Sequence, residues 1–193
     1  MAGPVSEPRR FARFRAEPLS GRPGIFPLPD DGLCLSSFLL VHPAGKPHEA
    51  LVGQMDPTGP WSETAAVDPE RIATFQGRWV LPACQLLFFE DPTAAARRIA
   101  SEQLGLPLLP IAPPQVFSEA YGRETSGSRD PHWDFHFVSR AEWPGGDPAG
   151  SRGRLWKELK FVDAPETPRS SFARGHGDIL ALAGLTPLDA TTR

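Results

Sequence analysis

The chain has 193 residues, a mass of 21.0 kDa and a formal net charge of −3. A chain of this length predicts one domain with tails. Hydrophobic residues make up 40% of the sequence, which is enough for one core. The sequence has no stripe of clustered Lys and Arg of the kind that binds nucleic-acid backbones, and its apolar runs are shorter than the roughly 18 residues of a membrane span.

The two cysteines, Cys34 and Cys84, form no C-x-x-C pair, so the sequence predicts neither a disulfide framework nor a zinc site. The N-terminus lacks an apolar run of signal-peptide length. We therefore expect a soluble, cytoplasmic protein that has no nucleic-acid or membrane partner.

Composition divides the chain into three segments. Residues 1–31 are rich in Pro, Arg and Gly and predict an N-terminal arm, in which RRFARFR (Arg9–Arg15) is either an edge strand or part of the arm. Residues 32–185 carry the regular hydrophobic patterns and are expected to form the domain, and residues 186–193 form a C-terminal tail.

The first part of the domain predicts strands. An apolar run at Leu33–Val41 predicts a strand, and His48–Met55 after a turn predicts its hairpin partner. A long polar connection follows, with a helical turn expected at Pro69–Phe75, and RWVLPA (residues 78–83) predicts a short strand.

The clearest predicted helix begins after Asp91, which suits the N-cap, with Pro92 at the first helical position. Gly105 suits the left-handed position that ends a helix. The apolar stripe of this helix consists of Ala95, Ile99, Ala100 and Leu104.

The last part of the chain predicts a strand within residues 108–122, an alternating strand at His132–Trp143 and a further strand within residues 154–166. An amphipathic helix is predicted within residues 171–185. Hairpin-linked strands with one central and one terminal helix favour an α/β or α+β sandwich over a purely parallel sheet.

The stretch from Cys84 to Leu106 places Glu90, Arg98, Glu102 and Gly105 at a distinctive spacing. This spacing resembles the Nudix box, a loop–helix–loop signature with a Glu, an Arg-Glu pair, a Glu-Glu pair and a closing Gly. The preceding WVLPA also resembles the strand that leads into the box. The resemblance extends over roughly residues 32–185 and implies a Nudix-like α/β/α sandwich with a mixed sheet.

The departures from the box are equally specific. Ala83 and Cys84 stand where two glycines are expected, and Ile99 stands where the Glu after the Arg is expected. Gln103 stands where the second Glu of the Glu-Glu pair is expected. The box is therefore degenerate, because two of the expected metal-binding carboxylates are absent.

The resemblance implies a hydrolase of nucleoside diphosphates linked to another group, with Mg²⁺ or Mn²⁺ as cofactor if the protein is active, and otherwise none. It assigns catalytic roles to Glu90, Arg98 and Glu102, and metal binding to Glu90, Glu102 and Gln103. An ordinary ion pair between Arg98 and Glu102, four residues apart on a helix, is the alternative role for those two residues.

On the strand at His132–Trp143, the side chains of His132, Asp134 and His136 are expected to share one face. Together with Glu119 they are the predicted substrate-binding residues. A His-x-Asp-x-His face could also hold a transition metal, whereas the simpler interpretation is a polar cleft face behind an aromatic core face. Glu124 is a further candidate metal ligand or base.

Three other residue types allow two interpretations each. His176 either belongs to the cap of the terminal helix, with Asp178 in the first turn of that helix, or is a functional residue of the site. Cys84 is either a reactive thiol near arginines or a small buried residue. Three tryptophans either stack on a base or ribose of a ligand or belong to the core. These are Trp61, Trp79 and Trp133.

Three functions remain open from the sequence. The first is a divergent Nudix hydrolase that works with a depleted metal site. The second is a catalytically silent Nudix-like module that binds a nucleotide-like small molecule or a protein partner, with a homodimer among the assemblies that the resemblance implies. The third discards the resemblance and leaves a small α+β protein of unknown role.

Overall fold

The computed structural model describes residues 13–14, 33–121, 132–151 and 153–189. The helices are α1 (Trp61–Thr64), α2 (Pro69–Phe75), α3 (Pro92–Arg98) and α5 (His176–Leu182), and the shorter turns are a π-helical turn η1 (Ile99–Gln103) and two 3-10 turns, η2 (Pro148–Ser151) and η3 (Arg169–Ser171). The strands are β1 (Arg13–Phe14), β2 (Leu33–His42), β3 (Glu49–Met55), β4 (Ala83–Gln85), β5 (Gln115–Tyr121), β6 (His132–Glu142) and β7 (Trp156–Asp163).

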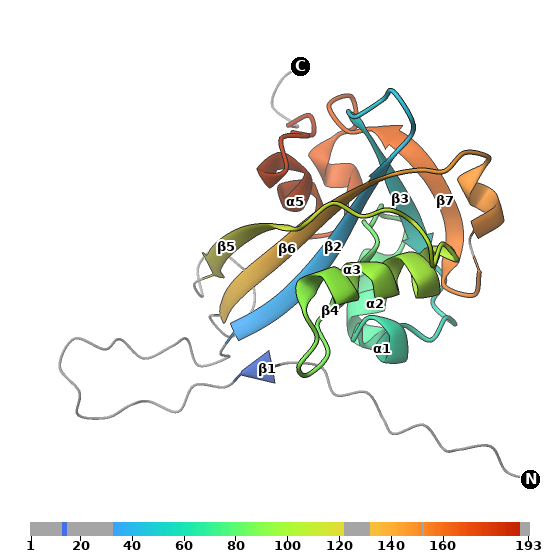
Figure 1. Cartoon of the computed structure of the whole chain (residues 1–193). Helices are drawn as coiled ribbons and strands as arrows, with labels where there is room; N and C mark the ends of the chain where they lie inside the picture. Colours follow the sequence, from blue (N-terminus) through green and yellow to red (C-terminus); the bar gives the residue numbers. More distant parts are fainter. Residues whose placement is uncertain (1–12, 15–32, 122–131, 152, 190–193) are drawn as a thin grey trace, which may run out of the picture.

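Strand β2 is the centre of the larger sheet (Figure 1). It pairs in parallel with β6 along its whole length, from Leu33 opposite Trp133 to His42 opposite Glu142. Its other edge pairs antiparallel with β1 and with β4, and β5 pairs antiparallel with the far edge of β6. The sheet is therefore mixed, as the sequence predicted.

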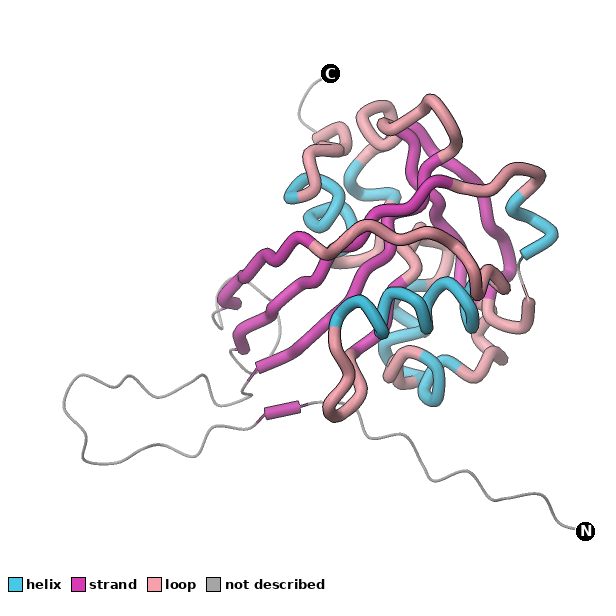
Figure 2. Tube along the Cα trace, viewed as in Figure 1, coloured by secondary structure: helices cyan, strands magenta, loops and turns pink. Residues whose placement is uncertain are grey.

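Alternation along β2 separates two cores. Leu39 and Val41 point into a cluster that contains Ile99 of the predicted helix, whereas Phe38 and Leu40 point into a second cluster with α5. Because α3 and α5 belong to different clusters, they cover opposite faces of the sheet, as Figures 1 and 2 show. This layering confirms the expected α/β/α sandwich.

The predicted helix forms with the expected ends. Asp91 caps it by accepting hydrogen bonds from the backbone N–H groups of Thr93 and Ala94, and Gly105 has a φ of 68°. The sequence did not predict that the last part, η1, widens into a π-helical turn. We call α3 and η1 together (Pro92–Gln103) the box helix.

Two strand predictions were wrong. The segment after the first turn does not pair with β2; β3 pairs antiparallel with β7 instead and forms a separate two-stranded sheet. RWVLPA makes only isolated bridges at Trp79 and Val80, and the regular strand in this region is β4, which begins at Ala83.

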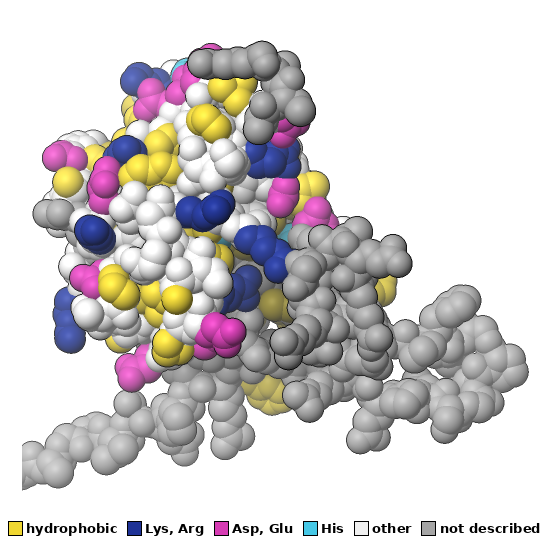
Figure 3. All heavy atoms as spheres, turned by 180° about the vertical axis from the view of Figure 1, so that it is seen from behind, with side chains coloured by type: hydrophobic (Ala, Val, Ile, Leu, Met, Phe, Trp, Pro, Cys, Tyr) yellow, Lys and Arg dark blue, Asp and Glu magenta, His cyan; other side chains and the backbone are white. Residues whose placement is uncertain are grey.

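The two described residues of RRFARFR, Arg13 and Phe14, form the edge strand β1. The rest of the predicted arm, and Glu124, lie outside the described residues. Figure 3 shows basic and acidic side chains interspersed on the face that it presents. Within the described ranges no helix is long and apolar enough to cross a membrane.

Candidate functional site

The predicted catalytic pair Glu90 and Arg98 forms a largely buried ion pair. Nε and Nη2 of Arg98 donate to the two carboxylate oxygens of Glu90, each at 2.8 Å, and both side chains are only 10% exposed. The backbone N–H of Leu87 donates to the same carboxylate at 2.8 Å. Both oxygens of Glu90 are therefore already bound within the protein.

The remaining N–H groups of Arg98 join the box helix to its surroundings. Nη1 donates to the carbonyl of Thr64 at 2.9 Å, and Nη2 donates to the carbonyl of Gln85 at 2.9 Å. Nη2 also lies 3.2 Å from Sγ of Cys84. One guanidinium thus connects α1, β4 and the loop that carries Glu90, which is a structural arrangement.

The positions where the resemblance expects metal ligands point elsewhere. Ile99 is 1% exposed and Gln103 is 2% exposed, and both pack inside the protein. Nε2 of Gln103 donates to the carbonyl of Ala83 at 2.7 Å, and Oε1 of Gln103 is buried without a hydrogen-bond partner among the described residues. Glu102, by contrast, is exposed.

As they lie, the box residues do not fit a divalent metal ion. Mg²⁺ and Mn²⁺ need several converging oxygens. Here the carboxylate of Glu90 is bound by Arg98. The side-chain amide of Gln103 directs its N–H group, and not its oxygen, at the carbonyl of Ala83. Within the described part of the chain, no group of three or more His, Cys, Asp or Glu residues could hold a metal ion.

The predicted substrate-binding residues come together on the other face of the sheet. Asp134 lies opposite Glu119 of β5, and His136 lies opposite Ser36 of β2. Nε2 of His136 is 3.4 Å from the carboxylate of Glu119. This is the face that carries Phe38 and α5, so these residues are separated from the box helix by the sheet. The side chain of His132 is outside the described residues.

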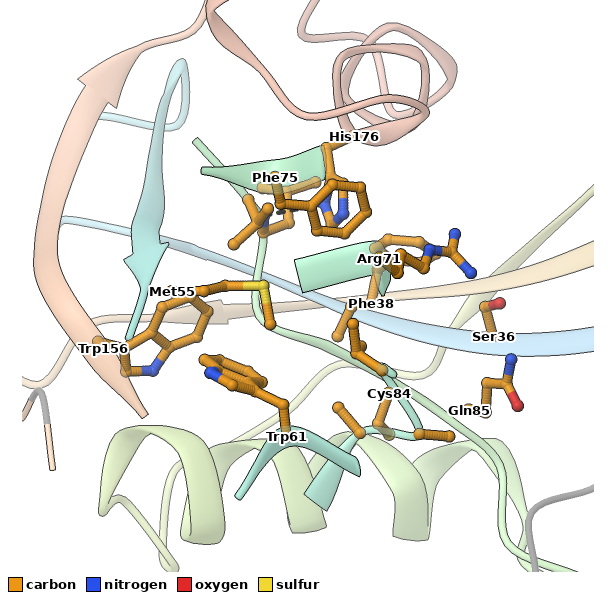
Figure 4. Close-up of a pocket in the computed structure, with 16 residues that line it drawn as sticks. Ser36, Phe38, Met55, Trp61, Arg71, Phe75, Cys84, Gln85, Trp156 and His176 are labelled. Carbon is orange, nitrogen blue, oxygen red and sulfur yellow. Dashed lines mark hydrogen bonds between the residues drawn. The ribbon is translucent and has the colours of Figure 1, made fainter. Parts of the chain in front are cut away.

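An aromatic pocket of about 70 Å³ lies beside this polar face, between β2, α2 and the start of α5 (Figure 4). Trp61, Met55 and Trp156 line one side, and Arg71, Ser36 and Gln85 lie toward the other. Phe38, Phe75, Cys84 and His176 are among the further lining residues. The pocket therefore has an apolar interior and a polar rim.

His176 reaches into this pocket from the first turn of α5. Its Nδ1 accepts a hydrogen bond from the backbone N–H of Leu81 at 3.0 Å, which fixes the tautomer with the proton on Nε2. Burial, helped by the positive charge of Arg71 and by His136, lowers the pKa of His176 to about 3. The ring is thus a neutral hydrogen-bond donor at physiological pH, and its Nε2 has no hydrogen-bond partner among the described residues.

The cation at the rim is Arg71. Its guanidinium carbon lies 5.6 Å from the centre of the Phe75 ring, and its side chain is exposed. The Phe75 and Phe38 rings both meet His176 edge-on, at 5.6 Å and 5.7 Å between ring centres. A flat group that enters the pocket would meet aromatic edges inside and a positive charge outside.

A wall of side chains separates the pocket from the box helix. Trp61 packs edge-on against Trp156 at 4.8 Å between ring centres, and Nε1 of Trp156 donates to the carbonyl of Gln103 at 2.8 Å. Cys84, on the same wall, contacts Arg98. The box helix therefore lies behind the pocket wall and does not line the pocket.

Comparison with known proteins gave likenesses in structure alone. No protein-family model matches the sequence, and no curated protein matches it. The chain is similar to the NUDIX domain of NrtR from Shewanella oneidensis complexed with ADP ribose, at 12% identity over 79% of this chain and 86% of that one, with a TM-score of 0.48. It is also similar to a mutT/nudix family protein from Listeria innocua (19%, 78% and 91%, TM-score 0.45) and to the dihydroneopterin triphosphate pyrophosphohydrolase of E. coli (13%, 79% and 85%, TM-score 0.44).

The box helix, the mixed sheet and the terminal helix stand in the order and layers that the sequence resemblance implies. The fold is Nudix-like. Likenesses as distant as those above bear on nothing further, since one fold carries many functions.

The residues of the box-like stretch divide into two groups by their contacts. Glu90, Arg98 and Gly105 hold the loop–helix–loop together, whereas positions 99 and 103 serve packing. The sequence revealed these two exchanges. It did not reveal that Arg71 and His176, which are far apart in the chain, line the same pocket. The only sequence feature that bears on this is Phe75, an apolar residue one helical turn after Arg71 that also lines the pocket.

Cys84 is a buried thiol rather than a reactive one. It is 4% exposed, and burial, only partly offset by Arg98, raises its pKa to about 12. Trp61 likewise belongs to the core, whereas Trp133 stacks on Phe135 and is 36% exposed.

The raised pKa of Cys84 predicts a loss of stability at high pH. The unfolded thiol has a pKa near 9.0 and the folded one near 12, so between these values the unfolded state releases a proton that the folded state keeps. This group's contribution to the free energy of unfolding is complete below pH 9 and falls by about 1.4 kcal/mol per pH unit above it. Urea titrations from pH 8 to 10.5 should show a shallower decline for Cys84→Ala than for the wild type; parallel curves would contradict the assignment.

Proposed function

We propose that this protein is a Nudix-fold binding module that holds a small molecule with a flat ring and an anionic group, without metal-dependent hydrolysis. The observation that carries the proposal is the aromatic pocket with Arg71 at its rim and a neutral His176 donor inside. This is the second of the functions that the sequence left open, with a nucleotide-like small molecule as the ligand class.

The size and lining of the pocket support a ring rather than a whole dinucleotide inside. A volume of about 70 Å³ is far below the roughly 300 Å³ of a pocket that encloses a drug-sized ligand. The ring would enter between Phe75 and Met55, with an acceptor atom facing Nε2 of His176. The anionic part of the ligand would stay at the rim near Arg71.

The box supports binding without turnover. Phosphoryl transfer depends on positioning and on cations that neutralise developing charge. The carboxylates that would hold such a cation are absent at positions 99 and 103, and Glu90 is engaged by Arg98. Hydrolysis, with Glu102 as its remaining exposed carboxylate, stays the competing prediction that a turnover assay tests.

The first experiment measures binding and turnover on the same panel. ADP-ribose, NADH, dNTPs and diadenosine polyphosphates are titrated by calorimetry in EDTA, and phosphate or nucleotide release is followed with Mg²⁺ or Mn²⁺. ADP-ribose is included because the NrtR domain was solved with it. We expect binding in EDTA and no release. Metal-dependent release that Glu102→Gln abolishes would instead establish the hydrolase, and no binding of any probe would reject the small-molecule site.

Pocket variants should weaken binding in proportion to the contacts they remove. Arg71→Gln removes the rim charge, and His176→Asn keeps an acceptor for the N–H of Leu81 while removing the Nε2 donor. A hydrogen bond of about 1 kcal/mol corresponds to a weakening of roughly five-fold, and a charged contact to ten-fold or more.

The matched control for these variants is Arg174→Gln, because Arg174 is exposed and lies two residues before His176 without lining the pocket. It should bind the probe as the wild type does. Equal weakening in all three variants would place the ligand elsewhere or indicate a general effect of net charge.

A further inference from the structure

Gln103 contacts two walls of the pocket from behind. The side-chain Nε2 of Gln103 donates to the carbonyl of Ala83 at 2.7 Å, and the main-chain carbonyl of Gln103 accepts a hydrogen bond from Nε1 of Trp156 at 2.8 Å. Ala83 and Trp156 both line the pocket, whereas Gln103 is 2% exposed and lies on the box helix. One residue therefore connects η1 with β4 and with β7.

The chemistry of the contact with Ala83 depends on the amide. A backbone carbonyl oxygen accepts hydrogen bonds and never donates them. A carboxylate at position 103, which the box resemblance expects, would place a second acceptor against that oxygen, and two buried acceptors are compatible only with a cation or a proton between them. The amide of Gln103 supplies its own N–H and needs neither.

We propose that the side-chain amide of Gln103 does in this protein what a bound cation would do between a carboxylate and the carbonyl of Ala83, and so positions the pocket wall without metal. Gln103 is then a positioning residue for the pocket. Its effect on binding rests on the proposed function, whereas its effect on stability does not.

The surroundings of Gln103 fix where this contact lies. The adjacent Glu102 is exposed, whereas Gln103 is buried. The π-helical turn at Ile99–Gln103 lies where the helix meets Trp156, and Trp156 is seated against Gly53. A side chain without a donor at position 103 would leave the carbonyl of Ala83 without this hydrogen bond.

The test compares thermal unfolding of the full chain at pH 8 in EDTA and in millimolar Mn²⁺. The wild type should melt at the same temperature in both. Gln103→Glu should melt roughly 5 °C lower than the wild type in EDTA, since it gains a buried acceptor facing an acceptor. Mn²⁺ should recover part of that loss, because an ion that binds only the folded state raises the melting temperature.

Gln103→Met and Glu102→Gln serve as matched controls. Gln103→Met removes the donor at similar size, so it should melt below the wild type and gain nothing from Mn²⁺. Glu102→Gln changes the neighbouring exposed carboxylate and should melt as the wild type does. Any recovery that also occurs in these controls would be nonspecific and would overturn the proposal.

Two further outcomes would overturn it directly. A wild type that melts lower in EDTA than in Mn²⁺ would mean that a metal, and not the amide, holds the wall. A Gln103→Glu variant that equals the wild type in EDTA, or that is destabilised without any response to Mn²⁺, would mean that the amide does not stand in for a cation. If the stability results hold and no probe binds the wild type, the proposed function fails while this inference stands.

Discussion

Replacement of Arg98 by Met should destabilise the protein by about 3–5 kcal/mol, the usual cost of removing one partner of a buried ion pair. The carboxylate of Glu90 would then be buried without its counter-ion, and the carbonyls of Thr64 and Gln85 would each lose a donor. In a chain of this size the loss corresponds to a fall in melting temperature of roughly 10 °C. Urea denaturation followed by circular dichroism measures it.

Arg97→Met is the matched control, because Arg97 is the preceding residue of the same helix and is exposed. We expect it to change the free energy of unfolding by no more than about 0.5 kcal/mol. If both variants lost the same stability, the ion pair with Glu90 would contribute nothing of its own. If Arg98→Met lost activity or binding while keeping its stability, the catalytic role that the resemblance assigns would be supported instead.

Replacement of Gly53 by Ala should displace the Trp156 ring. A Cβ atom at Gly53 would lie 2.3 Å from Cε3 of Trp156, a separation that real side chains essentially never show. Either β3 or the ring must then move, and overpacking of this kind costs about 1–3 kcal/mol. The hydrogen bond from Trp156 to Gln103 would weaken at the same time, which adds about 1 kcal/mol.

Near-ultraviolet circular dichroism and tryptophan fluorescence report this displacement, because Trp156 also packs against Trp61. Gly150→Ala is the control, since a Cβ atom there meets no atom of the described residues within 4 Å. We expect its spectrum and melting temperature to match the wild type. An unchanged tryptophan spectrum in Gly53→Ala would mean that the ring is not seated against β3 as the structure has it.

Local chemistry predicted the box helix well. The carboxylate of Asp91 accepts hydrogen bonds from the first free N–H groups of the helix. Pro92 has no N–H group and therefore fits the first helical position, and Gly105 adopts a left-handed φ without strain. These residues act within a few positions of one another, so their effect can be read from the sequence. The π-helical turn was missed because it depends on how Ile99 and Gln103 pack against distant strands.

The pairing of the strands was less predictable. His48–Met55 follows Leu33–Val41 after a turn, which usually indicates a hairpin. β2 instead pairs with β6, and the sequence holds no local sign of that choice. The continuous apolar run at Leu33–Val41 is consistent with the observed burial of β2 on both faces, because a strand covered on both faces belongs in the middle of a sheet.

The site divides in the same way. Alternation placed Asp134 and His136 on one face of β6, and the structure confirms that arrangement. The helical spacing suggested Glu102 as the ion-pair partner of Arg98, whereas the carboxylate that Arg98 holds in the structure is that of Glu90. The meeting of Arg71 with His176 could not, since it depends on α2 and α5 packing on the same part of the fold.

The parallel pairing of β2 with β6 has a consequence for synthesis on the ribosome. β2 ends at His42, yet the strand that covers its whole length begins at His132. The strand that carries the apolar residues Leu39 and Leu40 therefore cannot pair with β6 until most of the chain has emerged, because long-range pairing comes late in folding. An early, uncovered strand of this kind is where a nascent chain is most exposed to self-association or to chaperones. Production of the protein should therefore be more sensitive to translation rate and chaperone supply than its thermal stability implies.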